Sequence, residues 1–223
     1  KKIRHTPLSA SSYISLPPSI AAKRAVINVD NPDNRCFAYA IMSKVLHDRR
    51  VGHPQRHTKY TQEIWSLFNF SGIRYPTPFQ DVKIFERNNN ASVNIYGVEN
   101  NQRAKSSYVY PIRISEKFNR ANHFDLLYLQ QDDANSPEVS GHTAQVEKIR
   151  TLLAVGRYIT DLARLVGSQI TSDEHRIFIC RRCLTHFGTQ NLLNMHEKIC
   201  GSLDPVKCVM PKDARERTCD FKN

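Results

Sequence analysis

The sequence predicts an α+β fold followed by a small ββα unit that binds a metal ion. Three segments rich in β-branched and aromatic residues, 92–98, 108–114 and 124–129, predict the strands of a short sheet. Apolar residues at helical spacing before and after these segments predict flanking helices. A C-x2-C pair, followed after twelve residues by His-x3-Cys, predicts the ββα unit.

Each element can be justified from local sequence. The helix expected from Cys36 to His47 has apolar residues on one face, and Asp33 and Asn34 precede it as caps. A long amphipathic pattern predicts a helix over 144–166, either continuous or interrupted at Gly156. In chain order, the expected elements are an extended Ser/Pro-rich arm (1–20), a strand (25–29), helices at 36–47, 62–68 and 79–87, the three strands, an exposed loop (130–141), the long helix, the metal-binding unit and an irregular polar tail (201–223).

The metal ligands are predicted to be Cys180, Cys183, His196 and Cys200. Two thiolates on a tight turn, with an imidazole and a thiolate one helical turn apart, suit one tetrahedral Zn²⁺. Apolar residues at 178, 187 and 193 occupy the three positions where a ββα finger packs its small core. Zinc binding supplies folding free energy that so short a unit cannot obtain from burial.

The finger's helix is poorly suited to sequence-specific recognition of DNA. The positions that contact base edges in such fingers correspond to Thr189, Leu192 and Met195, and two of these are apolar. The connection at 171–175 is short and polar, so the finger is expected to dock. We expect its Leu192–Met195 face to pack on the main domain, on the tail, or on a partner chain.

The net charge of +11 favours a polyanionic partner, most simply nucleic acid. Residues 1–60 contain eleven Lys or Arg against three Asp, a surplus of 11 − 3 = +8. The alternative is a solubilising basic surface. The candidate nucleic-acid contacts are Lys1, Lys2, Arg4, Lys23, Arg24, Arg49, Arg50, Arg181 and Arg182.

Composition also argues against membranes and disulfides. No run of about 18 apolar residues exists, so no membrane partner is expected. The six cysteines are too few and too uneven for a disulfide framework, and they suit a reducing compartment, nucleus or cytoplasm.

Cys36 is a candidate nucleophile because it stands at the start of the first long helix. The unpaired N–H groups of a helix N-terminus favour the thiolate. His123 opens a later strand and is the candidate base, as in papain-like proteases. The alternative, a buried inert cysteine, is favoured when these residues are considered alone.

Residues 33–41, Asp-Asn-Arg-Cys-Phe-Ala-Tyr-Ala-Ile, resemble the D-G-x-C-x-x-x-A motif of ovarian-tumour (OTU) cysteine proteases, many of which are deubiquitinases. The resemblance implies a small papain-like domain in which Cys36 is the nucleophile and Asp33 shapes the oxyanion-hole loop. It also implies a base from a strand that carries His followed by an aromatic residue, and a ubiquitin-like or polyprotein substrate.

A wider resemblance covers about 200 residues. Its ordered segments are 25–29, 31–37, 84–90, 93–97, 111–115, 123–129, 162–169, the finger, 210–212 and 221–223. Together they resemble the region that precedes the exonuclease domain in protein-primed family B DNA polymerases of Polinton/Maverick elements and related viruses. The resemblance implies that polymerase domains would follow residue 223, and that their catalytic carboxylates lie outside this chain.

The sequence departs from that family pattern at one important place. Aligned on 162–169, the family's His-Tyr pair, which best matches the OTU catalytic His, corresponds here to Val155 and Gly156. Valine cannot accept a proton, so thiol activation is expected to be lost unless His123 or His142 serves.

The expected organisation is a basic arm (1–24), an OTU-like domain (25–170), a zinc finger (171–203) and a polar tail (204–223). The expected function is an accessory region of a mobile-element or viral DNA polymerase. It would bind nucleic acid or protein without sequence specificity and carry a degenerate protease site; the alternative is an active OTU-like cysteine protease.

Overall fold

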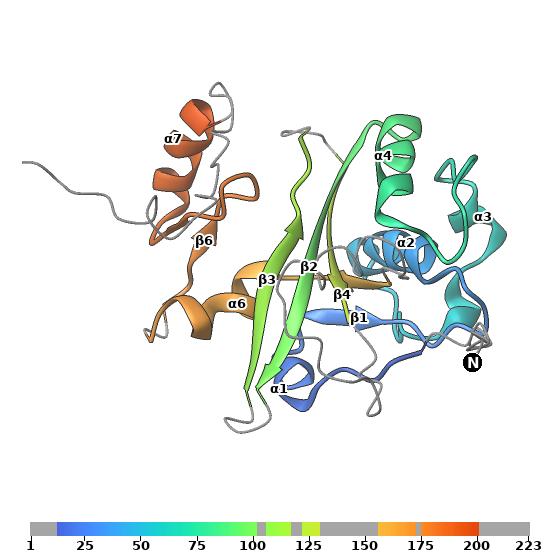
Figure 1. The fold of residues 1–223 in the computed structure, drawn as a ribbon, viewed down its shortest axis with the longest axis horizontal. Helices are drawn as coiled ribbons and strands as arrows, with labels where there is room; N and C mark the ends of the chain where they lie inside the picture. Colours follow the sequence, from blue (N-terminus) through green and yellow to red (C-terminus); the bar gives the residue numbers. More distant parts are fainter. Residues whose placement is uncertain (1–12, 102–105, 117–121, 130–155, 173–174, 201–223) are drawn as a thin grey trace, which may run out of the picture.

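A five-stranded mixed sheet lies at the centre of the protein, with helices on both faces and a separate ββα unit to one side (Figure 1). The computed structural model describes residues 13–101, 106–116, 122–129, 156–172 and 175–200. The fold is thus mixed α+β, as the sequence predicts. The described helices and strands are α1 (Pro18–Ala21), β1 (Val26–Asn28), α2 (Cys36–Asp48), η1 (His57–Lys59), α3 (Gln62–Trp65), α4 (Phe79–Asn88), β2 (Ala91–Asn101), β3 (Ser106–Arg113), β4 (Asn122–Tyr128), β5 (Arg157–Ile159), α6 (Leu162–Ile170), β6 (Phe178–Ile179), β7 (His186–Phe187) and α7 (Gln190–Cys200).

The central sheet has the strand order β1-β5-β4-β2-β3. Strands β2 and β4 are parallel, and the other neighbours are antiparallel. The predicted segments 92–98, 108–114 and 124–129 coincide closely with β2, β3 and β4. The sheet has more strands than these because β1 and β5 extend it at the β4 edge.

Helices α2, α3 and α4 cover one face of the sheet and form the larger core with it (Figure 1). The predicted helix from Cys36 is confirmed, and nearly all of its first two turns are buried. Phe37 of α2 meets Phe85 of α4 edge-to-face, with ring centroids 5.4 Å apart. Phe85 also packs on Phe124 of β4. These aromatic contacts fix the start of α2, and therefore Cys36, against the sheet.

Helices α1 and α6 cover the opposite face, where a second core forms. Ile20 of α1 is 1% exposed and lies in this core with Leu165 of α6. Residues 13–20 were expected within the extended arm, but from Pro18 onward this stretch is helical and buries Ile20 against the sheet. The remainder of the predicted arm, 1–12, lies outside the described residues.

A continuous helix over 144–166 is wrong between 156 and 161, the alternative of an interruption at Gly156 is confirmed, and 162–166 is helical as predicted. Arg157–Ile159 forms β5, which fills the place between β1 and β4, and α6 begins only at Leu162. Asp161, two residues after the end of β5, caps α6 by accepting a hydrogen bond from the backbone N–H of Arg164 at 2.9 Å. Residues 144–155 lie outside the described part of the chain.

Candidate metal centre and neighbouring sites

The ββα unit places the four predicted metal ligands at one point. Strands β6 and β7 pair antiparallel, with Phe178 opposite Phe187, and α7 follows. The C-x2-C turn is held by its own backbone, because the Leu184 N–H donates to the Cys180 carbonyl at 2.8 Å. Leu193 of α7 is buried, and the ring centroids of Phe187 and His196 are 4.8 Å apart. The predicted finger core therefore supports the ligands.

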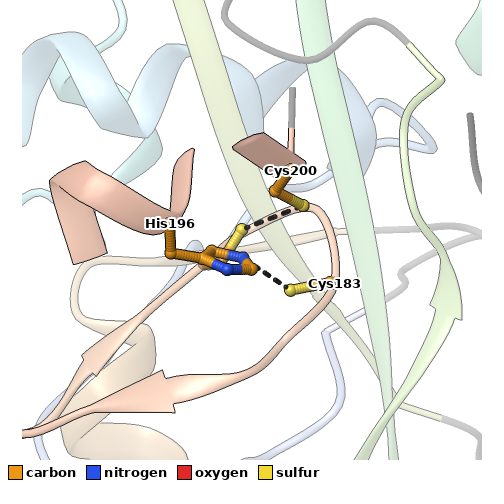
Figure 2. A group of neighbouring side chains, drawn as sticks. Cys183, His196 and Cys200 are labelled. Atoms are coloured by element: carbon orange, nitrogen blue, oxygen red, sulfur yellow. Dashed lines mark hydrogen bonds between the residues drawn. The ribbon is translucent and has the colours of Figure 1, made fainter. Parts of the chain in front are cut away.

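The ligand atoms of Cys180, Cys183, His196 and Cys200 all lie within 4.8 Å of one another. The Cys183 Sγ is 3.1 Å from the His196 Nε2, and Figure 2 shows these two side chains beside Cys200. The Cys180 and Cys200 sulfurs are 3.9 Å apart. Tetrahedral metal–sulfur bonds of about 2.3 Å place two sulfurs about 3.8 Å apart. The cluster therefore has the size and donor set needed to hold one metal ion.

The crowded thiols differ in acidity. Burial alone would raise the pKa of Cys183, but hydrogen bonds with Thr185, Cys180 and His196 lower it to about 6. Burial and the negative charge of neighbouring thiols raise the pKa of Cys200 to about 11. Three thiolates in so small a space repel one another, and a bound divalent cation would offset that repulsion.

The finger is docked on the main domain through the turn that carries Cys180 and Cys183. Arg181, inside C-x2-C, places its Nε 2.8 Å from Oδ2 of Asp125 on β4. The Asn94 side chain of β2 donates to the Arg181 carbonyl at 2.9 Å. His123 completes the group: its Nε2 is 2.9 Å from Asp125 Oδ1, and its Nδ1 is 2.8 Å from the Ser92 hydroxyl. A chain of polar contacts therefore runs from the finger into the sheet.

Asp125 is almost completely buried, so its charge depends on these partners. Burial alone would raise the pKa of its carboxyl group. The hydrogen bond and charge of His123, with the guanidinium of Arg181, outweigh burial and hold the pKa below its ordinary value.

The docking face differs from the expected one. Leu192 and Met195 are 51% and 64% exposed, so neither packs on the main domain. The contact is made instead by Arg181 and by Ile179 and Leu184, which pack against the second core. The other two surfaces on which this face was expected to pack, the tail and a partner chain, lie outside the described residues. The prediction that the finger docks is correct, and the predicted face is wrong with respect to the main domain.

Cys36 begins α2, as predicted, and β5 passes directly beside it. A Cβ built on Gly156 would lie 2.4 Å from the Cβ of Cys36. Asn31, which is buried, has its side chain 3.5 Å from the Cys36 sulfur. Asp33 is half-exposed, and its Oδ1 accepts a hydrogen bond from the Arg35 N–H at 3.0 Å, which shapes the turn before the helix.

The structure does not bring His123 to Cys36. Leu127 pairs with Arg157, the residue that follows Gly156, and His123 precedes Leu127 by four positions on β4. At about 3.3 Å per residue, this separation is about 13 Å along the strand. Val155 and His142 lie outside the described residues.

The predicted nucleic-acid contacts do not form one surface. Lys23 and Arg24 follow α1 on one face of the sheet, whereas Arg49 and Arg50 follow α2 on the other. The Arg49 guanidinium is 3.3 Å from Glu63, and Arg181 is engaged with Asp125. Arg182 also lies in the metal-binding turn, while Lys1, Lys2 and Arg4 lie outside the described residues.

No protein-family model, curated protein or solved structure matches this chain. Among the described helices, none has the length and apolar character needed to cross a bilayer.

Proposed function

We propose that this chain is a nucleic-acid-binding accessory region of a mobile-element or viral DNA polymerase, and that it binds without sequence specificity. In this proposal the metal is zinc, because three cysteines and one histidine with their ligand atoms within 4.8 Å of one another are typical of structural zinc sites. The polymerase assignment rests on the sequence resemblance alone.

The observation that carries the proposal is the ion pair between Arg181 and Asp125. It attaches the finger to the main domain through the turn between Cys180 and Cys183, in a chain whose net charge is +11. The finger therefore contributes to the structure of the whole chain. The helix face that would contact bases presents Leu192 and Met195 instead of side chains that can hydrogen-bond to base edges. Nonspecific binding through phosphates is favoured by the net charge of +11 of the whole chain.

We expect short DNA or RNA oligonucleotides to bind with an affinity that falls steeply with salt and ignores sequence. Each neutralised phosphate adds close to one unit to the log–log slope, so between about 50 and 200 mM salt several contacts cost tenfold or more in affinity. Fluorescence anisotropy with two oligonucleotides of unrelated sequence measures both properties. Salt-independent binding, or a strong preference for one sequence, would contradict the proposal.

We further propose that the OTU-like protease site is degenerate. Val155, at the position of the family's histidine, has no group that accepts a proton. His123 is held by Ser92 and Asp125 at a distance from Cys36. The alternative, an active protease acting on a ubiquitin-like substrate, is favoured by Cys36 at the helix start and by the turn that Asp33 braces.

A ubiquitin-derived electrophile distinguishes these two possibilities. We expect the folded protein to form no adduct at neutral pH, because thiol activation needs a base. Intact-mass spectrometry detects the adduct, with a known deubiquitinase as the positive control. An adduct that forms on the folded protein and disappears in Cys36→Ala would establish the protease alternative.

A further inference from the structure

The central sheet has one long edge strand. Among the described residues, β3 pairs with β2 alone, so its other side is the edge of the sheet, and α6 lies beside it (Figure 1). The strand at the opposite edge, β1, has three residues, whereas β3 has eight. An edge strand presents N–H and C=O groups that can pair with an extended segment of another chain. A long edge offers more of these groups than a short one.

The backbone of Val109, in the middle of β3, is occupied by a side chain of α6. The Val109 N–H donates to Oε1 of Gln169 at 3.0 Å, and Nε2 of Gln169 donates to the Val109 carbonyl at 2.7 Å. In an antiparallel sheet, a residue can exchange two such bonds with the residue opposite it on the next strand. The carboxamide of Gln169 therefore makes at Val109 the two bonds that an additional strand would make.

The sequence of β3 favours strand pairing. Residues 106–112 carry no charge and include two tyrosines, a valine and an isoleucine, which all have high β propensity. Pro111 follows Val109 by two positions in regular register, so its backbone faces the same side of the strand, where it has no N–H to donate. Gln169 and Pro111 therefore leave neither of these two positions with a free N–H donor.

The contact between Gln169 and Val109 lies beside a cavity of about 160 Å³. Both residues line this cavity, together with apolar side chains of α6 and of the finger, such as Val166 and Leu184. Gln169 is half-buried and borders this space. Its carboxamide can therefore be removed without deleting a side chain of the second core, and the backbone of Val109 would then lose its partner.

We propose that the β3 edge is a latent pairing surface for the β3 edge of a second copy of this chain, and that Gln169 keeps it closed. Val109 presents one donor and one acceptor on the same side, a pattern that is complementary to itself. Two copies related by a two-fold axis at Val109 would each donate an N–H to the carbonyl of the other, which replaces the two bonds made by Gln169. This inference goes beyond the proposed function, because it concerns self-association and does not involve nucleic acid.

The test removes the carboxamide and follows the amide of Val109. Gln169→Ala is the test variant, and Gln80→Ala, an exposed glutamine of α4, is the matched control. At low protein concentration we expect hydrogen–deuterium exchange of the Val109 amide, read by NMR, to become about tenfold faster in Gln169→Ala, because one hydrogen bond is lost. The amides of Tyr108 and Tyr110, which face β2, should keep their exchange rates.

Self-association is measured by sedimentation velocity across a concentration series. We expect dimers of Gln169→Ala at high concentration, whereas the unmodified protein and Gln80→Ala remain monomeric. Gln169→Glu separates edge pairing from a general loss of stability. Its carboxylate cannot donate to the Val109 carbonyl, so the contact is weakened, but two copies would bring like charges together and this variant should stay monomeric.

Three results would overturn the proposal. A folded Gln169→Ala protein that stays monomeric at high concentration would mean that Gln169 does not prevent pairing. Dimers of both Gln169→Ala and Gln169→Glu would mean that association follows from destabilisation and not from the edge. Rapid exchange of the Val109 amide in the unmodified protein would mean that Gln169 does not hold the edge closed, and this result is independent of whether any variant folds.

Discussion

Replacing Cys183 by serine is expected to abolish metal binding, unfold the ββα unit and destabilise the main domain. Cys183 is exposed, so the substitution removes a ligand without disturbing a core. Structural zinc contributes about 10–16 kcal/mol to the folding of isolated fingers, and a short unit has little else to hold it. This change has the largest effect that we expect for a single substitution in this chain.

The main domain should respond because the finger is bound to it. Loss of the finger's structure releases Arg181 and leaves the buried Asp125 carboxylate without its guanidinium. Removing one partner of a buried pair costs about 3–5 kcal/mol, but the Arg181 side chain is 52% exposed, so we expect about 1–2 kcal/mol. For a chain of this size, that lowers the melting temperature by about 2–8 °C. Metal content per chain and a thermal melt followed by circular dichroism measure the two effects.

Two controls test whether the finger stabilises the main domain through the contact between Arg181 and Asp125. Arg181→Gln should keep the metal ion but lower the melting temperature of the main domain by a similar amount. Leu192→Ala, on the exposed face of α7, should change neither property. If Cys183→Ser lost its metal while the main domain melted as in the unmodified protein, the finger would be an independent appendage and the docking contact would be unimportant.

The finger was predictable because its information is local. Ligand spacing and three apolar positions specify a ββα unit within about 25 residues, and the structure assembles all four ligands. The start of α2 was equally visible, since helical periodicity begins at Cys36. By contrast, β5 comprises three residues inside a helix-like pattern, and its conformation depends on pairing with β1 and β4. Pairing over such sequence distances leaves little local signal.

The docking contact could not be derived from spacing. Arg181 and Asp125 are 56 positions apart and meet only after the sheet and the finger have formed. From the sequence, Leu192 and Met195 were the predicted docking surface, because a patch of exposed apolar side chains often marks a contact surface. One available signal was Asp125 itself, because an acid within an apolar strand needs a buried partner. That signal indicates that a partner exists but does not identify it.

The second large effect is expected at Gly156, which lies against Cys36. A Cβ at this position would be 2.4 Å from the Cβ of Cys36, well inside van der Waals contact. Both atoms are attached directly to the backbone, so a rotamer change cannot separate them, and the strand or the helix must move. Overpacking of this kind costs about 1–3 kcal/mol or more, and we expect Gly156→Ala to lie at the upper end. Thermal and denaturant unfolding measure the loss.

A double-mutant cycle tests whether that contact is the cause. Cys36→Gly removes the Cβ, after which the nearest atoms of residue 36 to the new methyl group are backbone atoms at 3.5 Å, an ordinary contact distance. Cys36→Gly/Gly156→Ala should therefore be more stable than the sum of the single changes predicts, by about 1.5 kcal/mol or more. Gly52→Ala, where nothing lies within 4 Å of a built Cβ, is the matched control and should change little.

The result also bears on the proposed loss of catalysis. As long as Cys36 keeps its side chain, position 156 has no room for a residue larger than glycine. If Gly156→Ala were as stable as the wild-type protein, a Cβ at position 156 would fit beside the Cys36 thiol. The packing constraint on position 156 would then be absent.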